Sequence, residues 1–438
     1  MPENRPFPEN TRAIAAGPGP SMADRPASAY IHVPFCVRKC AYCDFLSFAD
    51  ERSHACIEAY VDAVCREITL TPKWFPAEDP GRQAGEEEPS RRAGEEGCAE
   101  RTDAEECGRR PLETVYFGGG TPSLLSPSQV GKILTALRDA FGIKDSCEIT
   151  LEANPGTVNE EKLSAFREAG INRLSIGIQS LDDNVLKTLG RIHDSASAKK
   201  AILDAKNVGF RNISCDMMLG IPGQTMDSVK KTLEFFLEKE IPHISLYSLI
   251  LEEGTPLYAR LGGDIEKYVT QEQDREMYHY VTSRLAGNGY VHYEISNMAR
   301  PGYESRHNSM YWRAEPYYAF GAGAHYYLGN ERGRHAETLD EYIGALHEEN
   351  AKKEDVLITE EILSPEDRMK EYMMLGFRTR TGVGEEAFRE RFGMTVESAF
   401  GAEIEKEVKN RLVEYKDGTY RLTEKGVDLA NQVFMDYV

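Results

Sequence analysis

Short apolar runs alternate with amphipathic stretches between residue 28 and about residue 250. Six runs have the length of a strand: 29–35, 114–120, 148–154, 173–179, 212–220 and 243–251. The stretches between them carry apolar residues at helical spacing and predict helices over 54–70, 127–141, 160–169, 183–189, 195–208 and 225–239. Strands alternating with helices are typical of a parallel sheet, and near-continuous apolar strands predict a sheet buried on both faces. Six units are too few for a closed eight-strand barrel, so the pattern predicts an α/β fold, a partial, open (β/α)6 barrel.

This alternation ends near residue 250. Residues 251–363 contain an aromatic-rich run, and we expect them to form an α+β region that covers the barrel. Residues 364–438 combine helical patterns with two alternating runs joined by KDG, which predicts a hairpin and a winged-helix-like domain. This segment has 12 Lys and Arg against 15 Asp and Glu, a net charge of −3 that disfavours DNA binding. We expect it to pack against or cover the barrel mouth.

Two segments lack the apolar content of a core. Residues 1–27 and 77–110 are rich in polar residues, Gly and Pro, and both are predicted to be disordered. The second is an insertion between the first helix and the second strand. Its Cys98 and Cys107 could be redox-active or metal-binding, but loop cysteines without a role are the favoured interpretation.

The overall composition disfavours several classes of function. The net charge of −20 argues against binding nucleic acid or anionic lipid through charge. No apolar run is long enough to span a membrane, and the N-terminus lacks the apolar region of a secretory signal. Met22 is an alternative start to Met1. Nine scattered cysteines indicate reduced thiols in the cytoplasm rather than a disulfide framework.

Three of these cysteines carry the strongest chemical signal. Cys36, Cys40 and Cys43 follow the first predicted strand in the sequence CVRKCAYC, so they lie at the carboxyl edge of the sheet, where ligands bind in such folds. Zinc would need a fourth ligand, such as Asp44 or His32. A [4Fe–4S] cluster bound by three thiolates instead leaves one iron open to a small molecule.

Polar residues at the ends of later strands support a ligand at this edge. The glycine-rich run FGGGTPS follows the second strand and lets backbone approach a ligand closely. One polar residue at a strand end is usually a loop hydrogen bond, but a series of them is better explained by a shared ligand. The series comprises Glu152, Gln179, Arg191 and Asp216.

The CVRKCAYC loop resembles the cluster loop of the radical S-adenosylmethionine (SAM) superfamily, and residues 28–438 resemble the oxygen-independent coproporphyrinogen III oxidase family. The resemblance implies that SAM chelates the open iron and is cleaved reductively to a 5′-deoxyadenosyl radical. It also implies two SAM sites, although Tyr30 and Tyr42 could instead be aromatic packing beside the cluster. The implied contacts are Tyr30, Tyr42, Gly119 and Glu152 for the first SAM, and Gly120, Thr121, Gln179, Arg191 and Asp216 for the second.

Two features favour the HemW-type haem chaperone branch of this family over the oxidases. The oxidases carry a fourth cysteine two residues after the third, where this chain has Phe45. The HNSMYW run resembles the HNxxYW signature of the chaperones and implies haem contacts from His307, Asn308, Tyr311 and Trp312. A histidine among aromatic residues is more often a core residue, and His32 and His325 are alternative iron ligands.

The resemblance therefore implies a haem carrier that retains a SAM-ligated cluster and passes haem to an acceptor protein. The alternative is decarboxylation of coproporphyrinogen III to protoporphyrinogen IX by radical chemistry, and the enzyme assignment stays open. Reduction of the cluster would require a low-potential donor such as flavodoxin or ferredoxin.

Overall fold

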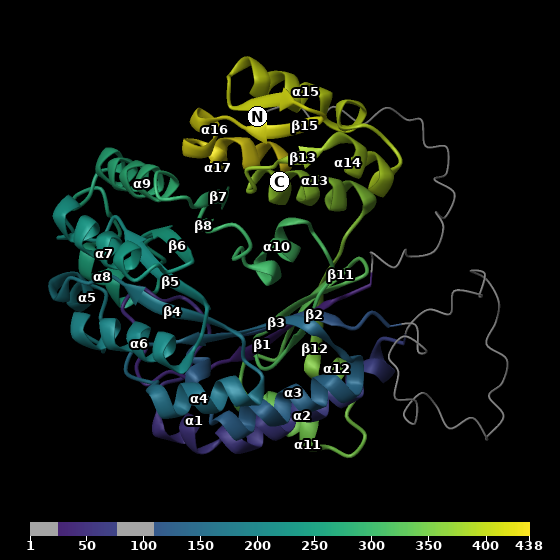
Figure 1. Cartoon of the computed structure of the whole chain (residues 1–438). Coiled ribbons are helices and arrows are strands. Elements are labelled where there is room, and N and C mark those ends of the chain that lie inside the picture. The colour runs from purple at the N-terminus through teal and green to yellow at the C-terminus, as the bar shows by residue number, and fades with distance from the viewer. Residues whose placement is uncertain (1–24, 77–108) are drawn as a thin grey trace.

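The computed structural model describes residues 25–76 and 109–438. The predicted tail over 1–27 and insertion over 77–110 lie outside these ranges except for their last few residues, and Cys98 and Cys107 lie outside them entirely. The described residues form one large sheet with helices on its outer face, two small three-stranded sheets, and a C-terminal group of helices (Figure 1).

The large sheet has nine strands in the order β7-β8-β6-β5-β4-β3-β2-β1-β9. Six adjacent strands are parallel, and they are the six predicted from the sequence: β1 (Ser28–Val33), β2 (Leu112–Gly119), β3 (Ile143–Ala153), β4 (Arg173–Gln179), β5 (Asn212–Leu219) and β6 (His243–Ser248). Three short strands extend the sheet: parallel β9 (Tyr318–Phe320) beside β1, and antiparallel β8 (Asn297–Ala299) and β7 (Val291–Glu294) beyond β6. The sheet stays open, which confirms the partial barrel.

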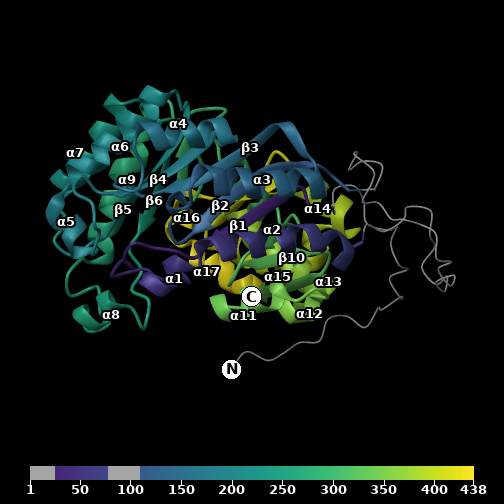
Figure 2. The ribbon, with the colours of Figure 1, turned by 90° about the horizontal axis from the view of Figure 1, so that it is seen from below.

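The outer face of the sheet is apolar and packs against helices. Side chains such as Ile31, Phe117 and Leu151 point to this face and are fully buried. Figure 2 shows the covering helices side by side. They are α2 (Ile57–Trp74), α3 (Pro127–Phe141), α4 (Glu160–Ala169), α6 (Ser195–Val208) and α7 (Met226–Glu238), with the short α1 (Glu51–Ala55), α5 (Asp183–Thr188) and 3₁₀ helix η3 (Pro122–Leu124) in the connections.

Local sequence signals place the helix ends. In α3, Ser126 and Gln129 form a capping box, and Pro127 occupies the first helical position, where its missing N–H costs nothing. Helix α4 begins after Asn159, whose side chain accepts a hydrogen bond from Lys162 N, and ends at Gly170 with a φ of 116°.

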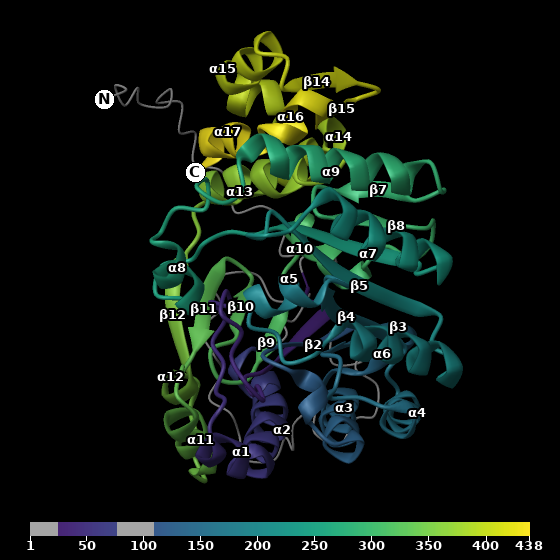
Figure 3. The same cartoon turned by 90° about the vertical axis from the view of Figure 1, so that its left-hand side faces the viewer.

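The inner face of the sheet is buried but polar, which differs from the expectation of two apolar faces. Alternate residues of the strands point inward, among them Tyr116, Thr150 and Arg173, which the strand register aligns in one row. Helix α10 (Arg306–Trp312) lies over this face, between the strands and the C-terminal helices (Figure 3). The Glu148 carboxylate accepts hydrogen bonds from the first two backbone N–H groups of α10. Tertiary contacts therefore bury the polar face.

The region between the barrel strands and the C-terminal helices is irregular. It contains α8 (Pro256–Leu261), α9 (Gln271–Ala286), α11 (Leu339–His347) and α12 (Lys353–Val356). Its antiparallel sheet has the order β10-β11-β12, formed by β10 (His325–Leu328), β11 (Glu331–His335) and β12 (Leu357–Ile362).

The C-terminal segment contains the predicted hairpin. Strands β14 (Val413–Lys416) and β15 (Thr419–Leu422) are joined by Asp417 and Gly418, which both have positive φ as a tight hairpin turn requires. β13 (Val383–Gly384) adds a third strand. Around this sheet lie α13 (Pro365–Phe377), α14 (Glu385–Phe392), α15 (Val396–Lys409), α16 (Glu424–Asp428), α17 (Ala430–Phe434) and the 3₁₀ helix η4 (Met435–Tyr437). None of the described helices combines the length and apolarity of a membrane span.

Candidate functional site

A cavity of about 590 Å³ opens at the carboxyl edge of the parallel strands. Its lining comes from the loop after β1, the ends of β2 to β6, and the loops that follow them. Among the described residues, none after Glu252 lines it, so the C-terminal helices do not cover this mouth; α13 packs against α10, and Asp428 of α16 pairs with Arg275 of α9. Eleven of the residues assigned from the sequence to the cluster or to SAM line it: Cys36, Cys40, Tyr42, Cys43, Gly119, Gly120, Thr121, Glu152, Gln179, Arg191 and Asp216.

The loop that carries the three thiols is closed at its base by backbone hydrogen bonds. Cys36 N donates to Phe48 O at 2.8 Å, and Phe48 N donates to Pro34 O at 2.7 Å. Side chains from other elements approach two of the thiols: Thr121 Oγ1 is 3.5 Å from Cys36 Sγ, and Arg191 Nη1 is 3.4 Å from Cys40 Sγ. The fold therefore holds the loop against the ends of β2 and α5.

The donor set of the loop fits an iron–sulfur cluster better than zinc. Within the described ranges, no three Cys, His, Asp or Glu side chains converge tightly enough to hold a single metal ion. His32, a candidate fourth zinc ligand, has its Nε2 within hydrogen-bond distance of Leu46 O and does not line the cavity. In a [4Fe–4S] cluster each thiolate binds a different iron, so three thiols spread around one cavity are a suitable set.

Two buried carboxylates face the cavity. Burial raises the pKa of Glu152 to about 7, with Asp216 adding repulsion, while a hydrogen bond donated by Tyr116 at 2.7 Å partly opposes the shift. Burial likewise raises the pKa of Asp216 to about 6. The Gln179 side-chain oxygen is buried with no hydrogen-bond partner among the described residues. Unpaired polar groups at a cavity wall indicate a polar ligand, because leaving them unsatisfied is costly.

The glycine run after β2 allows a close approach of two backbone segments. Gly119 has a φ of 109°, and a Cβ on it would lie 2.5 Å from the His32 ring. A Cβ on Gly120 would lie 2.7 Å from the carbonyl oxygen of Phe35. Both positions therefore require glycine, one for its conformation and both for space. Together they set the cluster loop directly beside the end of β2.

Arg191 ties several parts of the cavity wall together. Its Nη2 donates to Gly177 O at 2.7 Å and also to the Asn154 side chain, and its Nη1 reaches Cys40. The guanidinium thus links the ends of β3 and β4 to the cluster loop. A fixed cation at this point suits an anionic group in the cavity.

The two tyrosines assigned to SAM by resemblance lie in different places. Tyr42 lines the cavity, where burial raises the pKa of its hydroxyl. Tyr30 does not line it: the Tyr30 ring stacks on Tyr116, and the hydroxyl lies 3.1 Å from His32 Nδ1. Tyr30 thus packs beside the strand end in this structure, and its contact with SAM stays a prediction.

The HNSMYW segment forms α10 and does not reach the cavity. His307 is buried, its Nδ1 is 2.8 Å from the Thr114 hydroxyl, and its Nε2 is 2.8 Å from the Tyr311 hydroxyl. Burial lowers the pKa of His307 to about 3, so the ring is neutral. The Trp312 ring lies against the guanidinium of Arg378 at 4.4 Å. In this arrangement both ring nitrogens of His307 are engaged, as in a core histidine.

The remaining residues that the sequence predicted to contact haem or its iron lie apart from the cavity. Asn308 sits in the first turn of α10, where its backbone N–H donates to Ser305 Oγ. Of the alternative histidines, His325 is exposed and 3.6 Å from Glu360, and burial lowers the pKa of His32 to about 4. None of these three side chains lines the cavity.

Several lining residues were missed in the sequence. Met218 and Tyr247 lie one residue before the ends of β5 and β6, and the strand-end argument, which looked for polar side chains, would have found Tyr247 but not Met218. Ile250 lines the mouth from a loop, where an apolar residue carries no such signal, and Phe45, named in the sequence only as the residue in place of a cysteine, lines the mouth as well.

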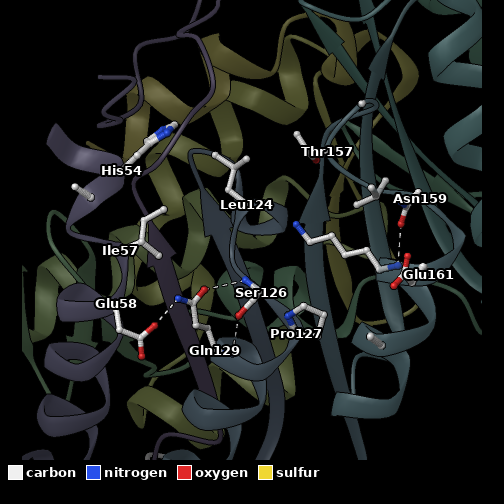
Figure 4. A pocket seen from close by; sticks show the side chains of 15 residues that line it. His54, Ile57, Glu58, Leu124, Ser126, Pro127, Gln129, Thr157, Asn159 and Glu161 are labelled. Carbon is white, nitrogen blue, oxygen red and sulfur yellow. Dashed lines mark hydrogen bonds between the residues drawn. The ribbon is translucent and has the colours of Figure 1, made fainter. Parts of the chain in front are cut away.

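A second cavity, of about 830 Å³, lies on the outer side between α1, α2, α3 and α4 (Figure 4). Several of its polar side chains are paired with one another or with backbone: Gln129 donates to Glu58 at 2.7 Å, and Lys162 donates to Ser123 O at 2.5 Å. His54 touches the cluster loop through Cys36 O at 2.9 Å, yet no cysteine lines this cavity. Among the described residues, the thiols and unpaired polar groups suited to bind a cofactor therefore lie at the sheet edge and not in this second cavity.

Comparisons with known proteins agree with a functional site at the sheet edge. Residues 30–236 match the model of the Radical SAM superfamily, and residues 363–429 match that of the HemN C-terminal domain. The chain is 34% identical to the haem chaperone HemW of Lactococcus lactis, covering 95% of this chain and 98% of that one. It is 33% identical to HemW of Bacillus subtilis, covering 93% and 98%.

Among solved structures, the coproporphyrinogen III oxidase HemN of Escherichia coli superimposes with a TM-score of 0.74 at 20% identity, covering 95% of this chain and 90% of that chain. At this level of identity the likeness establishes a shared fold and leaves the activity open. The sheet, the cluster loop and the C-terminal helices are thus parts of one known architecture.

Proposed function

Because the chain belongs to the HemW family of haem chaperones within the radical SAM superfamily, we propose that it binds haem and delivers it to an acceptor protein. The observation that carries this proposal is the cluster loop, which keeps three thiols but ends in an exposed Phe45 at the position where the oxidases carry a fourth cysteine. The identity of 33–34% to two haem chaperones over nearly the whole chain supports the same conclusion.

The superfamily implies a [4Fe–4S] cluster and SAM, and the cavity has suitable groups for both. Cys36, Cys40 and Cys43 would hold three irons, and SAM would occupy the cavity beside them. When bound, the cluster supplies the one-electron reduction by which SAM is cleaved in this superfamily. We assign no catalytic residue of the chain to a reaction on haem.

The residues of the chain bind and orient SAM in this proposal. Gly119 and Gly120 let the backbone at the end of β2 approach the ligand, and Thr121 and Tyr42 flank the thiols. The carboxylates of Glu152 and Asp216 suit the hydroxyl and amino groups of SAM, and Arg191 suits its carboxylate. Gln179 would satisfy its unpaired oxygen through the ligand. We propose that one or two SAM molecules bind in this cavity.

The resemblance also proposes His307, Asn308, Tyr311 and Trp312 as haem contacts. The hydrogen bonds at both ring nitrogens of His307 would have to break before it could bind iron. Haem contact from α10 would therefore require a rearrangement of this helix.

We further propose that the chain acts in the cytoplasm with a low-potential electron donor such as flavodoxin or ferredoxin. The seven cysteines in the described ranges are all free thiols, which suits a reducing compartment.

A haem titration run beside a turnover assay tests the proposal. Purified protein mixed with haem is expected to give a saturable Soret band near one equivalent. The anaerobically reconstituted protein, supplied with SAM, reductant and coproporphyrinogen III, is expected to form no protoporphyrinogen IX. Formation of 5′-deoxyadenosine in the same reaction shows that the cluster was active. Absence of a saturable Soret band would refute the carrier, and clear turnover would identify an oxidase.

A further inference from the structure

Exposed apolar side chains gather around the mouth of the cavity. Phe45 and Ile250 line the mouth and are 69% and 70% exposed. Val37 and Ile192, also exposed, line a small pocket that shares Cys40, Thr121 and Arg191 with the main cavity. We call these four residues the apolar rim. They come from three separate loops that line two neighbouring pockets with shared walls, and exposed apolar side chains grouped beside a polar cavity suit a binding surface.

The charges beside the apolar rim are unevenly placed. Arg38 and Lys39 follow Val37 on the cluster loop and line the cavity, while Asp44 and Glu252 line it next to Phe45 and Ile250. The Arg38 guanidinium is 3.0 Å from Gly190 O, whereas Lys39 makes no hydrogen bond or ion pair with the described part of the chain. One side of the mouth therefore offers a free ammonium group to an anion.

Haem matches this surface in shape and charge. Its ring is flat and apolar, and its two propionates lie at one edge, so it needs apolar contacts on its faces and cations at a single side. A cavity of 590 Å³ is of the size that holds one drug-sized ligand, which leaves no room for haem beneath SAM.

Two other places suit haem less well. His307 is enclosed and its ring nitrogens are both engaged, so α10 offers no open iron ligand. A cavity of about 360 Å³ on the other side of α10 is lined mainly by charged and polar groups, including Glu113, Glu304, Arg306 and Arg313. Neither offers an apolar surface for the face of a porphyrin.

We propose that haem binds across the mouth of the cavity, with its ring against the apolar rim and its propionates toward Lys39 and Arg38. This inference rests on the proposed carrier function and adds the surface that performs it. No residue of the apolar rim can ligate iron, so retention would depend on apolar contact and charge. Such binding suits a carrier that must release its cargo, and bound haem would shield SAM from solvent.

The test compares the haem affinity of full-length variants by Soret titration. Phe45→Ser and Ile250→Ser alter the apolar rim from two different segments, and Ile362→Ser is the matched control because Ile362 is 60% exposed on β12. The Kd for haem is expected to rise about tenfold or more for each rim variant, since each removes the burial of a large apolar side chain. The control is expected to bind as the wild type does.

A charge variant gives a second readout. Lys39→Glu is expected to weaken haem binding and to reduce its dependence on salt, because a propionate contact would be lost. Lys416→Glu, on the distant β14–β15 hairpin, is the matched control.

The outcomes separate this inference from the proposed function. Wild-type affinity in both Phe45→Ser and Ile250→Ser would overturn the apolar rim while leaving the carrier intact. Loss of haem binding in a His307→Ala variant that keeps a native circular dichroism spectrum, with the rim variants unaffected, would move the site to α10. Failure of the wild type itself to bind haem would refute the carrier and the apolar rim together.

Discussion

The close approach at Gly120 allows a sharp test of how the cluster loop is held. Replacement by alanine would place a methyl group 2.7 Å from Phe35 O, 2.9 Å from Val33 O and 3.0 Å from Phe35 N. All three atoms belong to the backbone between β1 and the cluster loop, so no side chain can rotate away to make room. Gly120 is not at a positive φ, and the expected cost therefore comes from space and not from backbone conformation.

The size of the effect follows from what must move. Relief of the contact requires the end of β2 to separate from β1, which lengthens the 3.0 Å hydrogen bond from Gly120 N to Val33 O. Overpacking a close-packed site costs about 1–3 kcal/mol, and weakening a buried backbone hydrogen bond costs about 1 kcal/mol. Gly120→Ala is therefore expected to lower the free energy of unfolding by about 2–4 kcal/mol.

Urea denaturation of the cluster-free protein measures this change, and iron content after anaerobic reconstitution measures the effect on the loop. The control is Gly131→Ala in α3, where an added Cβ would meet its nearest neighbour, Ala169 Cβ, at 4.0 Å. Because alanine is the better helix former, the control is expected to gain up to about 1 kcal/mol. An unchanged urea midpoint together with full iron content in Gly120→Ala would show that the site has room for the added methyl group and would refute the predicted clash.

Three further predictions concern the site and the inner face. Glu152 has a pKa raised from 4.5 to about 7 in the folded chain, so its stabilising contribution is complete below pH 4.5 and is lost as the pH rises to about 7. Glu152→Gln should remove this part of the pH dependence of the free energy of unfolding, measured on the cluster-free protein. An unchanged pH profile in the variant would contradict this prediction. Cys36→Ala should lose the spectrum of a cluster with about four irons, whereas Cys65→Ala should keep it, as iron and sulfide analysis will show. His307→Ala should lower the free energy of unfolding by about 2–4 kcal/mol, because it leaves a cavity and removes one hydrogen-bond partner each from the buried Thr114 hydroxyl and the partly buried Tyr311 hydroxyl, and a stability equal to the wild type would refute that packing role.

The sequence was sufficient for the features that local patterns determine. Six parallel strands, the position of the thiols at the sheet edge and the hairpin at Asp417 and Gly418 all follow from apolar periodicity and turn chemistry. The three added strands β7, β8 and β9 have four residues or fewer, and a run that short gives no periodic signal.

Tertiary contacts decided the features that the sequence left open or missed. In the inward row, Thr150 and Arg173 are buried and Tyr116 is partly buried because α10 covers them, and nothing local to the strands reveals that cover. The HNSMYW motif drew attention to His307 but could not show that Thr114, almost two hundred residues earlier, would engage its ring. The apolar rim is likewise invisible in the sequence, since its members meet only after folding.

The pairing of β9 with β1 has a consequence for how the chain folds. β1 forms near the beginning of the chain, yet one of its two neighbours, residues 318–320, is synthesised about 290 residues later. Until then, the strand that leads into the cluster loop has an unpaired edge, and unpaired edges recruit other chains. A fragment that stops at residue 250 would keep every described residue that lines the cavity except Glu252, and it would still leave the edge of β1 open to aggregation. Cluster assembly is therefore expected to follow completion of the chain.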